Sequence, residues 1–446
     1  MSGTANKLQS KQGLLGRLAE ARTLTDDLFG VVHPDALYDR PIPERHRIVF
    51  YMGHLEAFDW NLLANYVYGL ESWHRQADRL FAFGIDPVDG GLPTDQPSDW
   101  PGLSEIREYN THVRERLDAQ LKKDSFATET AGPDHFYSHE FILNAAIEHR
   151  LMHAETLAYM LHQLPLDRKI VLQTPPSPPA PPIVHRVIEI PAGRATLGTR
   201  RAGPSTFGWD NEFEEHSVDV PAFNIDAHKV TNGEFLEFVR QGGYEQASLW
   251  NRGDWDWVQE EGIEHPQSWV RDGDTWPYRT MFAEIPLPVE WPVYVSHAEA
   301  TAYARWAGKA LPAEAQWHRA AYGTSTGVEP AFPWGDTPPE AGNGNFDFCR
   351  WDPAPVTAHP TGQSSYGVED LLGNGWEWTS TLFEPFPGFR PFPFYPGYSA
   401  NFFDGKHYVM KGGSARTAAY MLRRSFRNWF QSRYPYVYAA FRCVSI

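Results

Sequence analysis

A proline-rich segment divides the chain into two parts of different character. Most of residues 174–182, TPPSPPAPP, are proline. Consecutive prolines favour an extended polyproline II conformation and cannot continue a helix inside a core. We therefore expect a semi-rigid linker at 173–183, a first domain at 10–172 and a second domain at 184–446. A length of 446 residues is itself typical of two or three domains.

The part before the linker has the periodicity of helices. Apolar residues recur at spacings of three to four in four segments: 11–29, 45–72, 103–123 and 136–164. Four helices of this length with polar connections predict a four-helix bundle. The irregular stretch 83–102 is long for a connection inside a compact domain, and such loops are often functional.

The part after the linker changes pattern. Short β-like runs such as HRVIEIPAG and YVMKGGS alternate with turns and tryptophan clusters. Only two helices are predicted there, at 231–241 and 296–308. The pattern predicts an α+β domain with much irregular structure, so the chain as a whole is expected to combine an all-α with an α+β domain.

Composition excludes several functions. Lys and Arg number 39 against 56 Asp and Glu, a net charge of −17, so the chain repels phosphate backbones and general nucleic-acid binding is not expected. No run of about 18 apolar residues predicts a membrane span, and the first residues lack the apolar region of a secretory signal. Two cysteines, Cys349 and Cys443, cannot form a disulfide framework, so we expect a reducing cytoplasm.

A pair of histidines is the strongest chemical signal. His149 and His153 lie four residues apart in an expected helix, which puts both imidazoles on one face, as metal binding requires. His54 lies among apolar residues of another expected helix, where an unpaired imidazole is costly, so it is the best third ligand. Three neutral imidazoles suit Zn(II), or Fe(II) with open positions for substrate and O₂. Glu155 points elsewhere and is expected to support the ligands or lie on the surface.

The histidine spacing by itself leaves alternatives open. Histidines four residues apart are more often a surface coincidence than a metal site. His135 and His139 have the same spacing but are expected near solvent, in the first turn after Gly132-Pro133-Asp134. Both pairs could be structural, and the physics of the sequence favours His149 and His153 only modestly.

Six fragments after the linker are specific in combination. They are VTNGEF at 230–235, GKALPAEAQW at 308–317, LGNGWEWTS at 372–380, KGGS at 411–414, SFRNW at 425–429 and AFRCV at 440–444. Their order and spacing resemble the formylglycine-generating-enzyme (sulfatase-modifying factor) family, which implies a C-type-lectin-like fold over 184–446. That family's own activity needs a cysteine pair just after the GGS element, and here GGSARTAAYMLRRSF has none. Oxidation of a sulfatase peptide is therefore not expected.

The two halves together resemble the sulfoxide synthases of ergothioneine biosynthesis. A DinB-like bundle with His followed by HxxxHxE, then this second fold, matches that family over about 10–446. The resemblance implies that His54, His149 and His153 hold a non-haem Fe(II). It also implies that O₂ is activated and a sulfur donor is joined to C2 of the imidazole of hercynine (N,N,N-trimethylhistidine).

The resemblance also assigns roles in the second half. A tyrosine before the GGS element serves the family as proton or electron donor, and Tyr395 and Tyr398 are the two candidates here. Asn428 and Trp429 match the positions that contact hercynine, where an indole face would bind the quaternary ammonium. Arg427 belongs to the same substrate-binding element. For the tyrosines and Trp429 the alternative is ordinary aromatic packing.

Two departures from the family's sequence pattern indicate which sulfur or selenium donor the enzyme uses. Synthases using γ-glutamylcysteine are expected to carry an acid directly after the Arg-Asn-Trp element and an arginine shortly beyond. Here Phe430 follows, Arg433 is out of register, and Met152 stands where the family often has a polar residue. A selenosugar needs stacking surfaces rather than a carboxylate clamp, so the resemblance favours the related selenoneine synthases.

Other readings stay open at this point. They are an ergothioneine sulfoxide synthase using γ-glutamylcysteine or cysteine, a zinc-dependent thiol transferase, and a non-catalytic sugar- or peptide-binding module. A calcium ion in the second domain is a further expectation from resemblance, suggested by acidic and Asn-rich loops such as NGNFDF at 343–348, with no ligand set that we can name.

Overall fold

A computed structural model describes residues 11–82, 92–126, 138–201, 207–273 and 275–445. Within it the chain forms two compact units, one built mainly from residues 5–172 and the other from 173–201 and 208–446. We describe each unit by itself. Among the described residues, no helix combines the length and apolarity needed to cross a lipid bilayer.

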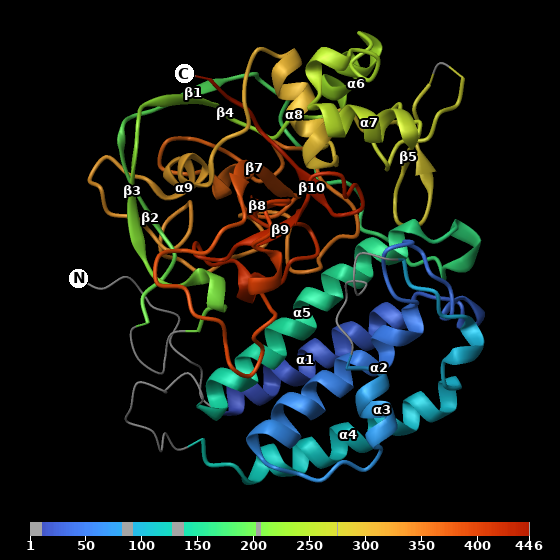
Figure 1. Ribbon diagram of the computed structural model, residues 1–446. Helices are drawn as coiled ribbons and strands as arrows, with labels where there is room; N and C mark the ends of the chain where they lie inside the picture. Colours follow the sequence, from blue (N-terminus) through green and yellow to red (C-terminus); the bar gives the residue numbers. More distant parts are fainter. Residues whose placement is uncertain (1–10, 83–91, 127–137, 202–206, 274, 446) are drawn as a thin grey trace. The chain divides into compact units, whose positions relative to one another are not determined.

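The first unit is the expected four-helix bundle (Figure 1). Its helices are α1 (Lys11–Gly30), α2 (Ile48–Asp59), α3 (Arg75–Leu80), α4 (Leu103–Lys123) and α5 (His139–Gln163). The short α3 is an addition to the four long helices. α5 packs on α1 and α2, and α2 packs on α4. α5 has no Gly or Pro, and the Ser138 hydroxyl caps its first turn by accepting the amide of Phe141 at 3.2 Å.

The second expected helix, 45–72, is not a single α-helix. α2 ends at Asp59 and continues as a π-helical segment, Trp60–Val67, with wider turns: the amide of Tyr68 bonds to the carbonyl of Leu63, five residues back. The apolar periodicity predicted helix over 45–72, whereas the helical segment runs from Ile48 to Val67, and a change of helix type leaves no distinct apolar pattern.

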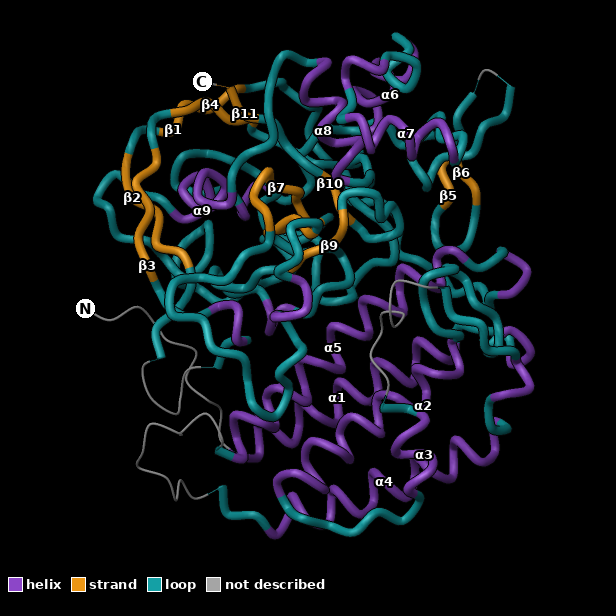
Figure 2. The backbone as a smooth tube through the Cα atoms, in the orientation of Figure 1, coloured by secondary structure: helices purple, strands orange, loops and turns teal. Residues whose placement is uncertain are grey.

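The second unit is an α+β domain with short strands and long loops, as expected (Figure 2). A three-stranded sheet has the order β1 (Val187–Ile190), β4 (Phe223–Asp226), β11 (Val444–Ser445). A four-stranded sheet has the order β10 (Ala439–Ala440), β7 (Trp376–Leu382), β8 (His407–Lys411), β9 (Asn428–Gln431). Two hairpins complete the set: β2 (Gly193–Leu197) with β3 (His216–Val220), and β5 (Tyr278–Arg279) with β6 (Glu284–Ile285).

The second unit has two helices more than expected. α6 (Asn232–Arg240) and α8 (His297–Trp306) fall in the two predicted segments, and each starts with a capping box, Thr231–Glu234 and Ser296–Glu299. α7 (Arg252–Glu260) and α9 (Glu314–Tyr322) were not predicted. α9 contacts β2, β3, β7 and β8. It buries Trp317 in the core with Ile190, Ile225, Leu371 and Val444.

The proline-rich segment is not a free spacer. Arg350 donates to the carbonyls of Pro175 and Pro176 at 2.8 and 2.7 Å, and the Thr357 hydroxyl donates to that of Pro181 at 2.6 Å. Polyproline II leaves main-chain carbonyls unpaired, so neighbouring donors can bind them. The segment is therefore part of the second unit.

Candidate metal and substrate site

Three histidines of the bundle meet at one point. His54 lies on α2, and His149 and His153 lie one turn apart on α5. The Nε2 atom of His153 lies 3.2 Å from Nε2 of His54 and 3.1 Å from Nε2 of His149. One nitrogen from each ring lies within 4.8 Å of the other two. The structure thus brings together all three residues that the sequence suggested as ligands.

The orientation of the rings suits a shared cation. Nδ1 of His54 bonds to the carbonyl of Phe81 at 2.7 Å, so Nδ1 carries the hydrogen and Nε2 presents its lone pair. Each neutral imidazole has one donor and one acceptor nitrogen, so three converging Nε2 atoms cannot all satisfy one another. A single metal ion would accept all three lone pairs. The donor set fits zinc or ferrous iron.

The buried, apolar surroundings of the three histidines keep their imidazoles neutral. The three side chains are between 2 and 4% exposed. Burial lowers the pKa of His54 to about 4 and lowers the pKa values of His149 and His153 well below the usual range. Phe58 stacks on His149 with ring centroids 3.4 Å apart, and Phe50 stacks on His54 at 4.8 Å. Neutral imidazole is the form that binds metal.

A buried charge network lies beside the triad and was not predicted. Arg150, between the two α5 histidines, forms ion pairs with Glu56 at 3.0 Å and Asp59 at 2.7 Å. Burial acts to raise the pKa of Glu56, but the guanidinium groups of Arg150 and Arg114 outweigh it and lower that pKa to about 2. Part of the signal was present in the sequence, since Glu56 and Asp59 interrupt the otherwise mostly apolar α2.

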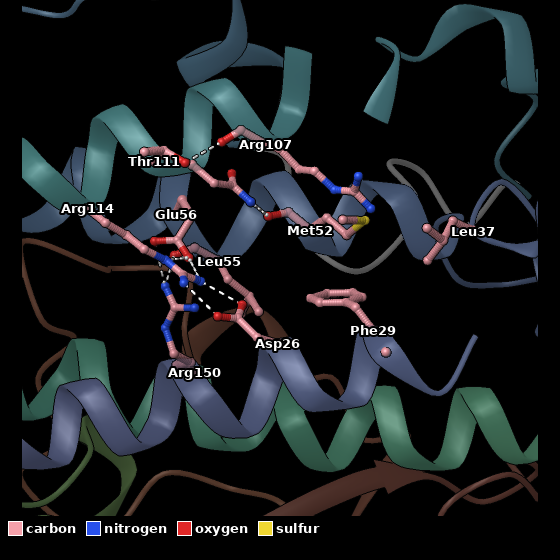
Figure 3. Close-up of a pocket in the computed structure, with 12 residues that line it drawn as sticks. Asp26, Phe29, Leu37, Met52, Leu55, Glu56, Arg107, Thr111, Arg114 and Arg150 are labelled. Atoms are coloured by element: carbon pink, nitrogen blue, oxygen red, sulfur yellow. Dashed lines mark hydrogen bonds and ion pairs between the residues drawn. The ribbon is translucent and has the colours of Figure 1, made fainter. Parts of the chain in front are cut away.

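A cavity of about 450 Å³ opens on the outer end of this network (Figure 3). Arg114 bridges Asp26 and Glu56 at one end, and Phe29, Leu37 and Met52 supply an apolar wall. None of the three histidines lines it. The carboxylates that line the cavity, Asp26 and Glu56, already pair with Arg114. The cavity is therefore continuous with the charge network and separate from the histidine triad.

The two candidate tyrosines of the second unit belong to one aromatic cluster. Tyr398 is buried and stacks on Trp209, with centroids 4.0 Å apart. Tyr395 is half-buried, and its ring centroid lies 5.5 Å from that of Tyr398. Trp429 meets Tyr398 edge-on at 5.5 Å. Trp209 is a member that the sequence did not indicate.

The substrate-binding candidates of β9 divide between the two faces of the strand. Trp429 stacks on Phe383 with centroids 4.1 Å apart and is half-buried. Asn428 and Phe430 alternate with it on the other face, where Phe430 stacks on Tyr434 at 5.2 Å. The side-chain oxygen of Asn428 accepts the amide of Trp429 at 2.9 Å. The structure therefore groups Trp429 with the tyrosines and sets Phe430 apart.

Arg427 has a role in packing. Its side chain is 2% exposed and pairs with Glu314 at 3.0 Å. It also donates to the carbonyl of Glu384 at 3.1 Å and lies over the ring of Phe386 at 4.0 Å. These contacts engage Nε and Nη1 of the guanidinium inside the second unit, and the substrate contact that the resemblance implies stays a prediction.

The structure also bears on the remaining histidines, on Glu155, on the two cysteines and on the expected calcium ion. His139 pairs with Asp124 near the surface, and His135 and residues 83–91 lie outside the described residues. Glu155 is buried, so its surface alternative is wrong. Cys349 is exposed and Cys443 buried, both as free thiols. Among the described residues, the only group of three or more His, Cys, Asp or Glu side chains close enough to hold a metal is the histidine triad, so the expected calcium ion gains no support.

Known families and proteins match both units. Residues 174–445 match the sulfatase-modifying factor enzyme 1-like domain, and residues 17–157 match the DinB superfamily. The formylglycine-generating enzyme of Mycobacterium tuberculosis is 31% identical over 250 residues, covering 46% of this chain and 76% of that protein.

Two further relatives bear on the chain as a whole. A hercynine oxygenase of Mycolicibacterium smegmatis is 42% identical over 269 residues, covering 56% of this chain and 62% of that protein. The ergothioneine biosynthesis protein 1 of Neurospora crassa is 27% identical over 499 residues, covering 92% of this chain and 55% of that protein. The chain spans less than two thirds of the length of these two relatives. It belongs to the sulfatase-modifying factor enzyme 1-like family and carries, before that domain, a bundle that matches the DinB superfamily, and in sequence it is similar to proteins named for hercynine oxygenation and ergothioneine biosynthesis.

Proposed function

We propose that this protein is a non-haem Fe(II), O₂-dependent enzyme that forms a C–Se bond at C2 of the hercynine imidazole, with a selenosugar as donor. The observation that carries the proposal is the buried triad of His54, His149 and His153, with three Nε2 atoms converging on one point. The names of its relatives, hercynine oxygenase and ergothioneine biosynthesis protein 1, support the substrate class.

The reaction needs an oxidant. Replacing the C2–H bond of hercynine and the Se–H bond of the donor by one C–Se bond removes two protons and two electrons, which O₂ accepts. Ferrous iron held by the triad would supply open positions for the substrate imidazole and O₂. The apolar rings of Phe50 and Phe58 would keep water from the ligands.

Residues of the second unit would bind hercynine and supply a proton for the reaction. The indole of Trp429 offers a face to the trimethylammonium group of hercynine, whereas Asn428 lies on the other face of β9 and is not placed to bind the same end of the substrate. Tyr395 or Tyr398 would hold or deliver a proton through its phenol. Tyr395 is less buried than Tyr398, whose ring is committed to the stack on Trp209, so we favour Tyr395.

The residues around Phe430 support a neutral donor. A dipeptide thiol carries carboxylates and an ammonium that need charged partners. Arg433, the nearest arginine after the Arg-Asn-Trp element, is already paired with Asp254 at 2.9 Å. Phe430 and Tyr434 offer instead a stacked aromatic surface suited to a sugar ring.

The second candidate is an ergothioneine sulfoxide synthase that uses γ-glutamylcysteine or cysteine. The names of the relatives favour it, because they refer to ergothioneine and hercynine. It shares the metal, O₂ and hercynine with the first candidate. It differs in the donor and in the product, because a sulfoxide carries one oxygen atom of O₂ on sulfur while the other oxygen atom leaves as water.

Turnover assays separate the candidates. Purified apoprotein is loaded anaerobically with Fe(II), supplied with hercynine and one donor, and exposed to O₂; products are identified by mass spectrometry. Turnover with a 1-seleno-sugar and little with γ-glutamylcysteine is expected. The reverse preference would assign the second candidate, O₂-independent transfer with zinc would assign a thiol transferase, and hercynine binding without product would indicate a binding module.

A matched pair of variants tests the triad. His153→Ala is expected to lose stoichiometric iron and turnover, because two imidazoles cannot replace three. His139→Ala is the control, since His139 has the same spacing from a neighbouring histidine but pairs with Asp124 away from the triad. Equal iron content in both variants would refute the assignment of the ligands.

A further inference from the structure

Arg150 joins the two helices that carry the triad. It follows His149 on α5, and its side chain is fully buried. Its Nη2 atom lies 3.0 Å from the carbonyl oxygen of Leu55, 2.7 Å from Asp59 Oδ2 and 3.0 Å from Glu56 Oε2. All three partners lie on α2, within five residues after His54.

These contacts hold α2 at a fixed distance from α5, and the spacing of the three histidine nitrogens depends on that distance. A three-histidine site needs its nitrogens placed to within about 0.5 Å, and here one ligand comes from α2 and two from α5. Helix packing through apolar side chains alone tolerates small sliding movements. A charged group that is hydrogen-bonded to a main-chain carbonyl and a carboxylate, and ion-paired with a second carboxylate, opposes such sliding, because separating it from the carboxylates would leave buried charges unpaired.

The network continues away from the triad. Glu56 also pairs with Arg114 of α4 at 2.7 Å, and Arg114 pairs with Asp26 of α1 at 2.6 Å, at the edge of the cavity in Figure 3. Arg114 pairs with the same carboxylate as Arg150, but its hydrogen bonds go to Asp26 on α1 and Glu56 on α2. The chain therefore offers a matched comparison between two arginines of one network.

We propose that Arg150 is a positioning residue for the metal site: by bonding α5 to α2 next to His54, it sets the spacing of the three imidazoles and hence metal affinity and coordination geometry. The proposal rests on the metal site proposed above and adds a residue that does not itself touch the metal or the substrates. It predicts that loss of Arg150 changes metal binding more than loss of Arg114 does.

The test compares Arg150→Met with Arg114→Met in the full chain. Co(II) is titrated anaerobically into each apoprotein, and its visible absorption reports both affinity and coordination geometry. We expect Arg150→Met to lower Co(II) affinity by roughly tenfold or more, the lower end of what supporting groups around metal ligands contribute, and to change the spectrum. Arg114→Met is expected to stay within about twofold of the wild type with an unchanged spectrum.

Urea unfolding of each apoprotein separates positioning from general stability. If a folded Arg150→Met variant binds Co(II) with wild-type affinity and spectrum, the inference about Arg150 is overturned but the metal site stands. If the wild-type protein binds neither Co(II) nor Fe(II), the proposed metal site is overturned as well. If Arg150→Met does not fold, Arg150→Lys decides. Lysine keeps the charge of Arg150 but offers fewer directed bonds. A wild-type Co(II) affinity and spectrum in Arg150→Lys would overturn the inference, whereas a reduced affinity would support it.

Discussion

Replacing Asp210 by asparagine is expected to remove a pH-dependent loss of stability from the second unit. Asp210 opens the short 3-10 helix Asp210–Glu212 and is fully buried. It accepts a hydrogen bond from the Ser399 hydroxyl, next to Tyr398. Burial is the largest influence and raises the pKa of Asp210 to about 6, although the bond from Ser399 acts in the opposite direction.

The sign follows from where the proton is held. The ordinary aspartate pKa is 3.8, so between pH 3.8 and about 6 the folded state keeps a proton that the unfolded state has released. The stability that this group contributes is therefore fully present below pH 3.8 and is lost as the pH rises through 6. At about 1.4 kcal/mol per pKa unit, the loss amounts to about 3 kcal/mol. Asparagine cannot ionise, so Asp210→Asn should escape this loss.

Urea unfolding between pH 4 and 7.5 measures the effect. Tryptophan fluorescence is a suitable signal for the second unit, since most of the 17 tryptophans lie after residue 184. The difference in free energy of unfolding between variant and wild type should shift by about 2 to 3 kcal/mol in favour of the variant as the pH rises. Asp219→Asn is the control, because Asp219 is exposed on β3. Parallel pH profiles for wild type and Asp210→Asn would refute the reasoning.

Three further predictions follow from buried or stacked side chains. Arg442→Met is expected to destabilise the second unit by about 3 to 5 kcal/mol in urea unfolding, because Arg442 binds the buried carboxylate of Glu377 through two bonds of 2.6 and 2.8 Å and its loss would leave only the weaker pair with Lys229 at 3.5 Å. Adding Glu377→Gln should recover part of the loss, and no recovery would contradict this. Trp429→Leu is expected to raise KM for hercynine about 2- to 30-fold, while Trp429→Phe keeps most of the affinity; equal KM values would argue against recognition by the ring. Cys349 should react with a thiol reagent in the folded protein and Cys443 only after unfolding, since burial raises the pKa of Cys443; two equally fast thiols would contradict this.

Much of the bundle was predictable from the sequence because its information is local. Apolar spacing located all four long helices, and an i, i+4 histidine pair necessarily shares one helix face. The pairing of Arg150 with Glu56 and Asp59 was not predictable in the same way, because the residues are about 90 positions apart and only the packing of α5 on α2 brings them together.

The second unit was harder to predict for related reasons. α7 and α9 are each nine residues long, and their sequences, RGDWDWVQE and EAQWHRAAY, contain only a few apolar positions at helical spacing. β9 was recognised as a motif and not as a strand, because its sequence NWFQ is too short to show an alternation. The aromatic cluster around Trp429 depends on contacts with distant loops, so no local pattern could indicate Trp209 as a member.

The pairing of β11 with β4 has a consequence for how the protein is made. Val444 lies opposite Ile225 in the sheet, and Val444 also packs in the core around Trp317. Contacts this far apart in sequence are slow to form, and the ribosome synthesises their two halves well apart in time. Until the later strand emerges, β4 has an unpaired edge and the core an open side. During that interval the nascent second unit is the part of the chain most in need of a chaperone, whereas the bundle, synthesised earlier, can already have folded.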